Sequence, residues 1–534
     1  MATMAMDMVR KHKYILVTLL LGTPSLVLSN EWSFDPAIKI NETYSDNVNF
    51  DNQNEESSFV NQTGLSLNSE YRALYASYNL DADVLYATYS HNSDNNDSFL
   101  TLNGDFNIQL WPNGISLVGS ASIENQTRNS MTNAYADIVS GNTVQVEQYS
   151  SGLSYTIDNS EYKLSSNLIY NTTKAEDNIS EQDGYSATLN SKNGTNTNYI
   201  FWDLTNNYNE RTSHTRSSRS YQSEIKIGYI TPYKFNPFIR YYDEDNSGNL
   251  GSNQNIESNS YGAGLRWQVT PRFIVDLSYN VPLNKDKLSE SEPDSKQIDN
   301  YYDLKINWQP TIRTTLSASV SQRFYGNSYD LSLSHVNKRF TNTIIYKESI
   351  DTFTRDNFAP VNEGVFLCSQ QSETFSYSQC LISNANELNT DSLTAIFSTR
   401  LVEDDEFSLN KKLNWISSLT LSRTTIKINL QRNERLNLQT DIEDLRQNAD
   451  FSISRKVSGY STIDLSVAYT ETRNFLNLPQ AQDNQYRYYK VNYNRKLNKT
   501  LSFDINISHL NRTSDPAAFV YKENRISLEL KKVL

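Results

Sequence analysis

Long hydrophobic runs are missing from this sequence after its first 29 residues. Of 534 residues 37% are hydrophobic, the mean hydropathy is −0.62 and the formal net charge is −13. No later segment approaches the roughly 18 apolar residues that a membrane-spanning helix needs, so we expect no such helix there. A transmembrane strand remains compatible with this composition, because it shows lipid only every second side chain.

Cysteine is nearly absent. The sequence has two, Cys368 and Cys380, which lie 12 positions apart in one polar stretch. In an exported protein such a pair predicts a disulfide within a loop, and two free thiols are the alternative. Two thiols with no histidine nearby make a weak metal site, so we expect no metal there.

Histidine is scarce, and no catalytic pattern is present. After residue 29 the histidines are His91, His214, His335 and His509. The sequence contains no HExxH, CxxC or GxSxG motif. We therefore expect no catalytic residues, no metal, no cofactor and no enzymatic activity. A Ser–His–acid hydrolase on the rim of a barrel is the less favoured alternative.

The N-terminal segment has the form of an export signal. Arg10, Lys11 and Lys13 precede an apolar stretch at 14–28, and a small residue, Ser29, fits a cleavage site. We interpret residues 1–29 as a signal peptide and residues 30–534 as a single domain. An uncleaved membrane anchor is the alternative, but an apolar stretch of about 15 residues is short for a span.

Aromatic residues and turn formers are abundant. The chain has 35 Tyr, 21 Phe and 6 Trp, more than is typical of disordered chains, together with many Asn, Ser and Thr. Alternation is regular in places: Leu501, Phe503, Ile505 and Ile507 share one face of residues 500–508, and polar residues take the other. This pattern predicts strands with one side in lipid and one side in water.

Short turns alternate with long polar segments along the chain. Eleven turns are expected, at Asn68-Ser69, Pro112-Asn113-Gly114, Asp158-Asn159, Asn193-Gly194, Thr231-Pro232, Thr270-Pro271, Pro310-Thr311 and Asn337-Lys338, and after Leu413, Val457 and Leu497. They predict a transmembrane antiparallel up-and-down β-barrel of about 24 strands (roughly 20–26), with short periplasmic turns and long outer loops. A soluble β-sandwich and a secreted β-solenoid are the alternatives.

The weakest part of this strand count is the region that holds both cysteines. Residues 348–391 are expected to form a long loop. Residues 392–401 and 407–412 both have the pattern of a strand, but an even number of strands requires that only one of them belongs to the barrel.

Basic pairs recur in the last quarter of the chain at spacings of 44, 40 and 36 residues. They are Lys411-Lys412, Arg455-Lys456, Arg495-Lys496 and Lys531-Lys532. On an acidic chain we interpret the first three pairs, with Trp111 and Trp415, as anchors at the membrane interface rather than nucleic-acid contacts. Trp267 and Trp308 also lie beside expected turns, where an aromatic girdle belongs.

Several segments resemble a known family. Trp308-Gln309-Pro310-Thr311-Ile312-Arg313-Thr314, followed by Gln322-Arg323-Phe324-Tyr325-Gly326, is similar to the outer-membrane β-barrel family associated with the PEP-CTERM/exosortase system, and Trp267 begins a second, shorter copy. Trp32 to Pro36 with Asp46-Asn47 resembles the family's N-terminal signature, and Glu523-Asn524-Arg525 resembles its end. One departure is Leu534, because barrel chains usually end in an aromatic residue read by the insertion machinery.

This resemblance implies the outer membrane of a Gram-negative bacterium and a link to exopolysaccharide export or surface sorting. It supplies no catalytic residues. The motif residues to which it assigns a structural role are Trp32, Pro36, Asp46, Asn47, Trp267, Trp308, Pro310, Arg313, Arg323, Gly326 and Asn524. The implied partners are outer-membrane lipid, the barrel insertion machinery, and exopolysaccharide or its export proteins. We expect a conduit with a wet lumen; a non-conducting scaffold or surface anchor is the alternative.

Overall fold

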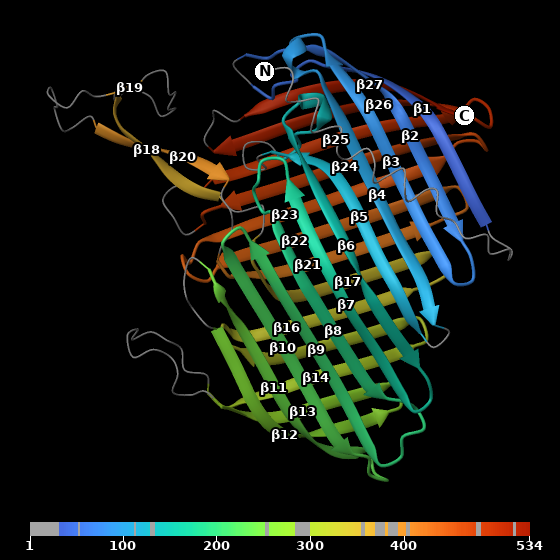
Figure 1. Ribbon diagram of the computed structural model, residues 1–534, viewed down its shortest axis with the longest axis vertical. Helices are drawn as coiled ribbons and strands as arrows, with labels where there is room; N and C mark the ends of the chain where they lie inside the picture. Colours follow the sequence, from blue (N-terminus) through green and yellow to red (C-terminus); the bar gives the residue numbers. More distant parts are fainter. Residues whose placement is uncertain are drawn as a thin grey trace.

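A computed structural model describes residues 31–51, 54–111, 114–128, 134–250, 256–283, 299–353, 358–368, 380–382, 393–401, 406–476, 482–515 and 520–534. The expected signal peptide lies outside these residues. Twenty-four strands form one antiparallel sheet that closes on itself (Figure 1). This ring confirms the predicted all-β barrel and its strand number. In the described part of the chain, no helix is long and apolar enough to cross a membrane.

The ring runs from β1 to β17 and then from β21 to β27, with each strand beside its neighbour in the sequence. Its first half is β1 (Glu31–Ser45), β2 (Ser58–Arg72), β3 (Ala76–Tyr89), β4 (Asp97–Trp111), β5 (Ile115–Thr127), β6 (Thr143–Asp158), β7 (Tyr162–Ala175), β8 (Gln182–Asn193), β9 (Ile200–Ser213), β10 (Arg216–Tyr229), β11 (Phe235–Asn249) and β12 (Ile256–Thr270). Its second half is β13 (Phe273–Pro282), β14 (Tyr301–Thr311), β15 (Thr314–Arg323), β16 (Gly326–Val336), β17 (Phe340–Asp351), β21 (Ser408–Thr420), β22 (Thr424–Asn437), β23 (Glu443–Lys456), β24 (Ser461–Asn474), β25 (Gln482–Lys496), β26 (Leu501–Asp515) and β27 (Tyr521–Val533). Two short 3-10 helices, η1 (Ser93–Asn95) and η2 (Ile138–Ser140), lie in connections of the first half.

The first and last strands close the ring. β1 pairs with β27 from Ala37↔Val533 to Ser45↔Arg525, while its other edge pairs with β2 over its whole length. Pro36 lies just before this seam and its carbonyl accepts a hydrogen bond from the Leu534 backbone. The N and C=O of a strand residue point to the same side, so the missing N–H of Pro36 costs no β1–β2 hydrogen bond.

Nine of the eleven expected turns join consecutive strands within a residue or two of the expected place, and two are wrong. β2 continues through Asn68 and Ser69, and the turn is at 73–75, where the Ala73 N–H bonds the Ala76 carbonyl. β21 continues through Leu413 to Thr420, because its alternation of apolar and polar residues does not stop at the basic pair. The connections on the side that we call periplasmic have two to six residues, and the long loops lie on the outer side. Two outer connections are also short, residues 214–215 between β9 and β10 and residues 324–325 between β15 and β16.

The region with the cysteines lies outside the ring. Residues 352–407 separate β17 from β21, which pair directly with each other. Within this insertion β18 (Phe358–Cys368), β19 (Cys380–Ile382) and β20 (Leu393–Leu401) form a separate three-stranded sheet, seen beside the barrel in Figure 1. Only one of the two strand-like stretches therefore belongs to the ring, as predicted. The loop expected at 348–391 begins later than predicted, because residues Glu348 to Asp351 are the last four of β17.

The two faces of the ring differ in chemistry. Outward-facing apolar side chains such as Leu465 and Val467 are 45% and 44% exposed, and Asp464 and Ser466 occupy the opposite face. Such exposure is costly in water and favourable in lipid. The barrel is thus an outer-membrane protein, with lipid around it and a polar wall inside.

Aromatic side chains line the periplasmic rim of the outward face. Trp267 stacks on Phe235 at a centroid separation of 5.9 Å, Trp308 lies 6.0 Å from Phe273, and Trp111 is 62% exposed. These positions form the predicted girdle. Trp415 lies deeper, where its indole N–H donates to the Asn342 side chain at 2.6 Å.

The basic pairs divide into two groups. Arg455-Lys456 end β23 and Arg495-Lys496 end β25, both at the periplasmic rim, where an interface anchor is expected. Lys411-Lys412 lie instead in the outer half of β21, so their expected place beside a turn is wrong. Lys412 approaches Asp351 to 3.7 Å there.

Candidate functional site

The inner wall of the barrel is the surface that a transported molecule would meet. On β22 it carries Lys427, Asn429 and Gln431, opposite the outward Ile426, Ile428 and Leu430. Asn429 donates to the Asp450 carboxylate on the next strand at 3.1 Å. Polar side chains of this kind suit a hydrated lumen, and side chains do not fill a ring of this many strands.

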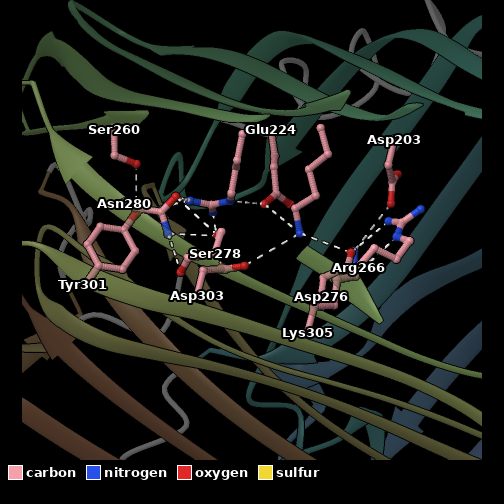
Figure 2. A network of polar contacts seen from close by, with 12 residues as sticks. Asp203, Glu224, Ser260, Arg266, Asp276, Ser278, Asn280, Tyr301, Asp303 and Lys305 are labelled. Carbon is pink, nitrogen blue, oxygen red and sulfur yellow. Dashed lines mark hydrogen bonds and ion pairs between the residues drawn. The ribbon is translucent and has the colours of Figure 1, made fainter. Parts of the chain in front are cut away.

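One part of the wall bends sharply, and inner side chains meet across the bend (Figure 2). Lys305 on β14 lies 3.9 Å from Asp203 on β9, although strands β10 to β13 lie between them in the ring. Lys226 on β10 lies 3.7 Å from Asp303 on β14. We call this bend, from β9 to β15, the charged corner.

Lys226 is at the centre of the charged corner. Its side chain is 2% exposed and its ammonium lies 3.4 Å from Glu224, 3.7 Å from Asp303 and 3.9 Å from Asp276. A buried ammonium without anions would be strongly unfavourable, and three carboxylates compensate its charge.

Two arginines complete the network, and one of them, Arg266, is labelled in Figure 2. Arg240 donates to Glu224 at 2.6 Å and also contacts Asp303, Asn280 and the Tyr301 hydroxyl at 3.3–3.4 Å. Arg266 binds both oxygens of Asp276, at 2.7 and 2.8 Å. Cations and anions therefore alternate along the corner, which stabilises each charge inside the fold.

Phenylalanine and glycine occupy part of the inner face at the bend. The inner side chains Phe201 and Phe238 are 3% and 4% exposed, and the Arg266 guanidinium lies 4.1 Å from the Phe201 ring centre. A Cβ added to Gly264 would lie 2.5 Å from the Leu277 carbonyl oxygen and 2.6 Å from Phe238. Phe238 and Leu277 belong to β11 and β13, the two strands that flank β12, so glycine leaves the room that these neighbours occupy.

A second buried ion pair extends the corner toward the outer side. Arg323 on β15 binds Glu244 on β11 through two guanidinium nitrogens. Tyr242 donates its hydroxyl to the same carboxylate at 2.7 Å. Arg323 and Gly326 both belong to the segment on which the family resemblance rests, and Gly326, the first residue of β16, has a φ of +114°. Arg323 therefore stabilises a buried carboxylate, and Gly326 allows a backbone conformation that other residues rarely adopt.

The N-terminal and C-terminal motif residues meet at the outer end of the seam. Asp46 accepts hydrogen bonds from the backbone N–H and the side-chain amide of Asn524, each at 2.7 Å. The Asn47 amide donates to the backbone carbonyl of Lys522 at 3.0 Å. The remaining motif residues lie at the periplasmic rim: Trp32, which donates to the Tyr78 hydroxyl at 3.2 Å, Pro310 at an irregularity in the β14–β15 register, and Arg313, which donates to Asn337 at 3.1 Å.

The periplasmic end of the seam holds a cavity of about 470 Å³ with a charged lining. Lys39 forms an ion pair with Asp83 at 2.8 Å within it. Asp35, Asp81, Lys499 and Lys531 also line it. Among the described residues, no group of three or more His, Cys, Asp or Glu side chains is arranged to hold a metal ion.

Sequence reasoning did not find the charged corner. Its residues are single charges at inner positions of strands that are distant in the sequence, and no local motif marks them. A usable signal was present, because Glu224, Arg240, Arg266 and Asp276 fall on the polar phase of apolar strands. Gly262 and Gly264 in β12 add a second signal for a close approach.

Comparison with known proteins gives only distant similarity. No family model and no curated protein matches the chain. Among solved structures it is similar to the siderophore receptor PirA from Pseudomonas aeruginosa, at 9% identity and a TM-score of 0.37, covering 93% of this chain and 80% of that one. The FrpB iron transporter from Neisseria meningitidis gives 9% identity, a TM-score of 0.38 and coverage of 93% and 82%. OmpT with loop L8 deleted, an outer membrane protein of Vibrio cholerae, gives 8% identity and a TM-score of 0.32, and the match covers 95% of this chain and 100% of that one.

Proposed function

We propose that this outer-membrane barrel is a conduit for exopolysaccharide export or surface sorting, as its resemblance to the PEP-CTERM/exosortase-associated barrels suggests. The observation that supports a conduit is the chemistry of the ring, which has 24 strands with an inner wall of amides, hydroxyls and charges. A hydrated polymer meets hydrogen-bonding partners along such a wall. The partners in this proposal are outer-membrane lipid, the insertion machinery and the polysaccharide or its export proteins. The proposal assigns the barrel no catalytic step.

Conductance in planar bilayers tests the proposal. Purified full-length barrel should give discrete single-channel steps, because an open polar lumen passes ions. An acidic polysaccharide added to one side should reduce the current if it enters the same lumen, whereas a neutral polymer too large to enter should not. A barrel that is inserted and heat-modifiable on gels but passes no current would contradict the conduit.

A non-conducting scaffold or surface anchor is the second candidate, and one observation favours it. Two segments from the outer side rest against inner-wall residues: 352–353, where the Thr352 hydroxyl lies 2.8 Å from that of Ser218 on β10, and part of the β5–β6 connection. Segments of this kind narrow a lumen. The same bilayer experiment separates the two functions, since a blocked barrel inserts without conducting.

A further inference from the structure

The connection between β5 and β6 folds into the barrel rather than away from it. Its base is tied at the ends of the two strands, where the Arg128 N–H bonds the Asn142 carbonyl at 3.3 Å. From there residues 134–141 reach side chains of β3, β24, β25 and β27. We call residues 134–141 the inner loop.

The strand residues that hold the inner loop belong to the inner face of the barrel. Thr470 alternates with the outward Val467 and Tyr469, and Arg525 alternates with the outward Ile526, which is 53% exposed. Since successive strand residues point to opposite faces, the loop lies inside the ring and not on the rim. Each of these residues is near the outer end of its strand.

An apolar contact fixes the loop on the β2–β3 side. Val139 is 7% exposed and packs with Val60, Ala87 and Tyr89 on the inner wall and with Val48 from the β1–β2 connection. The Tyr89 hydroxyl donates to the Ile138 carbonyl. The docked position of the loop is favoured because it removes the apolar surface of Val139 and its neighbours from water in the lumen.

An ion pair fixes the loop on the β27 side. Arg525 donates to Asp137 at 2.5 Å, and its side chain is 14% exposed. Asp137 is also the N-cap of η2, since its other carboxylate oxygen accepts from the Ser140 N–H at 3.2 Å. One carboxylate therefore both starts the helical turn and holds it to the wall.

The tip of the loop reaches β24 and β25. The Ala134 N–H donates to the Tyr486 hydroxyl at 3.2 Å, and the Tyr135 hydroxyl lies 3.0 Å from that of Thr470. The Tyr135 ring also packs 5.3 Å from Tyr486 and 5.5 Å from Tyr488. Burial raises the pKa of the Tyr135 phenol, so it remains protonated and able to hydrogen-bond at neutral pH.

We propose that the inner loop is a docked constriction that sets the width of the lumen near its outer mouth, and that the Asp137–Arg525 pair and the burial of Val139 hold it there. A constriction matters only if the barrel conducts, so this inference rests on the proposed function. This inference adds to the conduit the residues that limit the size of the molecules that pass through the lumen. A loop that narrows the lumen excludes compact solutes of large diameter before it excludes an extended polar chain.

The test combines two readouts on the full-length barrel. Asp137→Asn keeps an oxygen that can cap η2 and removes the charge that binds Arg525. Glu434→Gln is the matched control, because it removes a carboxylate that pairs with Arg432 at the outer end of β22, away from the loop. We expect Asp137→Asn to increase the single-channel conductance and Glu434→Gln to leave it unchanged. Arg525→Gln, which removes the same ion pair from the wall side and leaves the Asp137 cap of η2 in place, should increase the conductance as well.

The second readout does not require conduction. Val139→Cys should react slowly with a water-soluble maleimide in the folded barrel and on the order of tenfold faster when combined with Asp137→Asn, because a charged hydrogen bond contributes about that much to the docked population. Equally rapid labelling with and without Asp137→Asn would overturn the docked loop. If the barrel conducts and Asp137→Asn does not change its conductance, the constriction is refuted but the conduit is not. A third outcome is a barrel that fails to conduct both with and without Asp137→Asn, while Val139→Cys is protected from the maleimide. That result would refute both the conduit and the constriction and would support only the docked loop.

Discussion

Asp46 and Asn524, 478 positions apart in the sequence, are joined by two hydrogen bonds of 2.7 Å. One is donated by the Asn524 backbone and the other by its side-chain amide. They lie at the outer end of the seam between β1 and β27, the only place where the chain must close the ring without a covalent connection. The Asp46-Asn47 segment and the Glu523-Asn524-Arg525 segment thus meet in a single contact.

Weakening this contact should destabilise closure in a graded way. Asp46→Ala removes both hydrogen bonds and should cost about 1–2 kcal/mol, while Asn524→Ala leaves the backbone donor and should cost about half as much. The measurement is the temperature at which the folded band is lost in heat-modifiable gel migration. Asn79→Ala is the control, because the Asn79 amide makes long and therefore weak hydrogen bonds to Asp105, of 3.3 and 3.4 Å, on the inner wall away from the seam. Equal loss in all three variants would contradict a special role for the seam.

The Arg323–Glu244 pair should be one of the most sensitive points of the charged corner. Glu244 is 2% exposed in this pair, and Arg323→Met would leave it without its guanidinium partner. Breaking a buried pair costs about 3–5 kcal/mol. Adding Glu244→Gln to Arg323→Met should recover part of that loss, since the unpaired charge is then gone. Denaturant unfolding of the detergent-solubilised barrel measures this, with Arg432→Met as the exposed control. No difference between Arg323→Met and Arg432→Met would refute the argument.

Gly264 lies on β12 within the bend, where β11 and β13 leave little room for a side chain. Gly264→Ala places a Cβ 2.5 Å from the Leu277 carbonyl oxygen, so the strands must separate, at a cost of about 1–3 kcal/mol. Gly459→Ala in the β23–β24 turn is the matched control, because its Cβ would meet nothing within 4 Å. Lower stability or lower yield of folded barrel is expected for Gly264→Ala alone. If both variants fold like the wild type, β12 has no need of a glycine between β11 and β13.

The two cysteines give a prediction about the insertion. Cys368 on β18 is paired directly with Cys380 on β19 in the backbone register. Directly opposed antiparallel residues have Cα separations within the range that a disulfide spans. We therefore expect neither thiol to be alkylated in the unfolded protein unless reductant is added first. Alkylation of both thiols without reductant would show the alternative, two free cysteines.

Local patterns predicted most of the barrel, because lipid and water impose a period of two on every strand. The strand number came from the eleven expected turns and was right because each has a counterpart in the ring, although two of them were misplaced along their strands. The turn after β21 was missed because Leu421 to Arg423 contain neither Pro nor Gly, and Lys411-Lys412 repeated a signal that elsewhere marks a turn. Asn68-Ser69 has turn-forming residues inside a strand.

The charged corner and the inner loop depend on three-dimensional closure. Lys305 meets Asp203 only because the ring bends sharply between β9 and β14, and strand alternation says nothing about curvature. Asp137 meets Arg525 only because a connection folds inward, and its sequence looks like any polar outer loop. Contacts of this kind join distant parts of the chain without a local signature.

Cysteine labelling along one strand tests the arrangement of lipid outside and water inside most directly. Single cysteines at 462, 464 and 466 of β24 should react with a water-soluble maleimide in the membrane-inserted barrel, and those at 463, 465 and 467 should not. The three outward positions should instead react with a lipid-soluble maleimide. Uniform labelling by the water-soluble reagent at all six positions, or solubility of the folded protein without detergent, would contradict a closed barrel in the membrane.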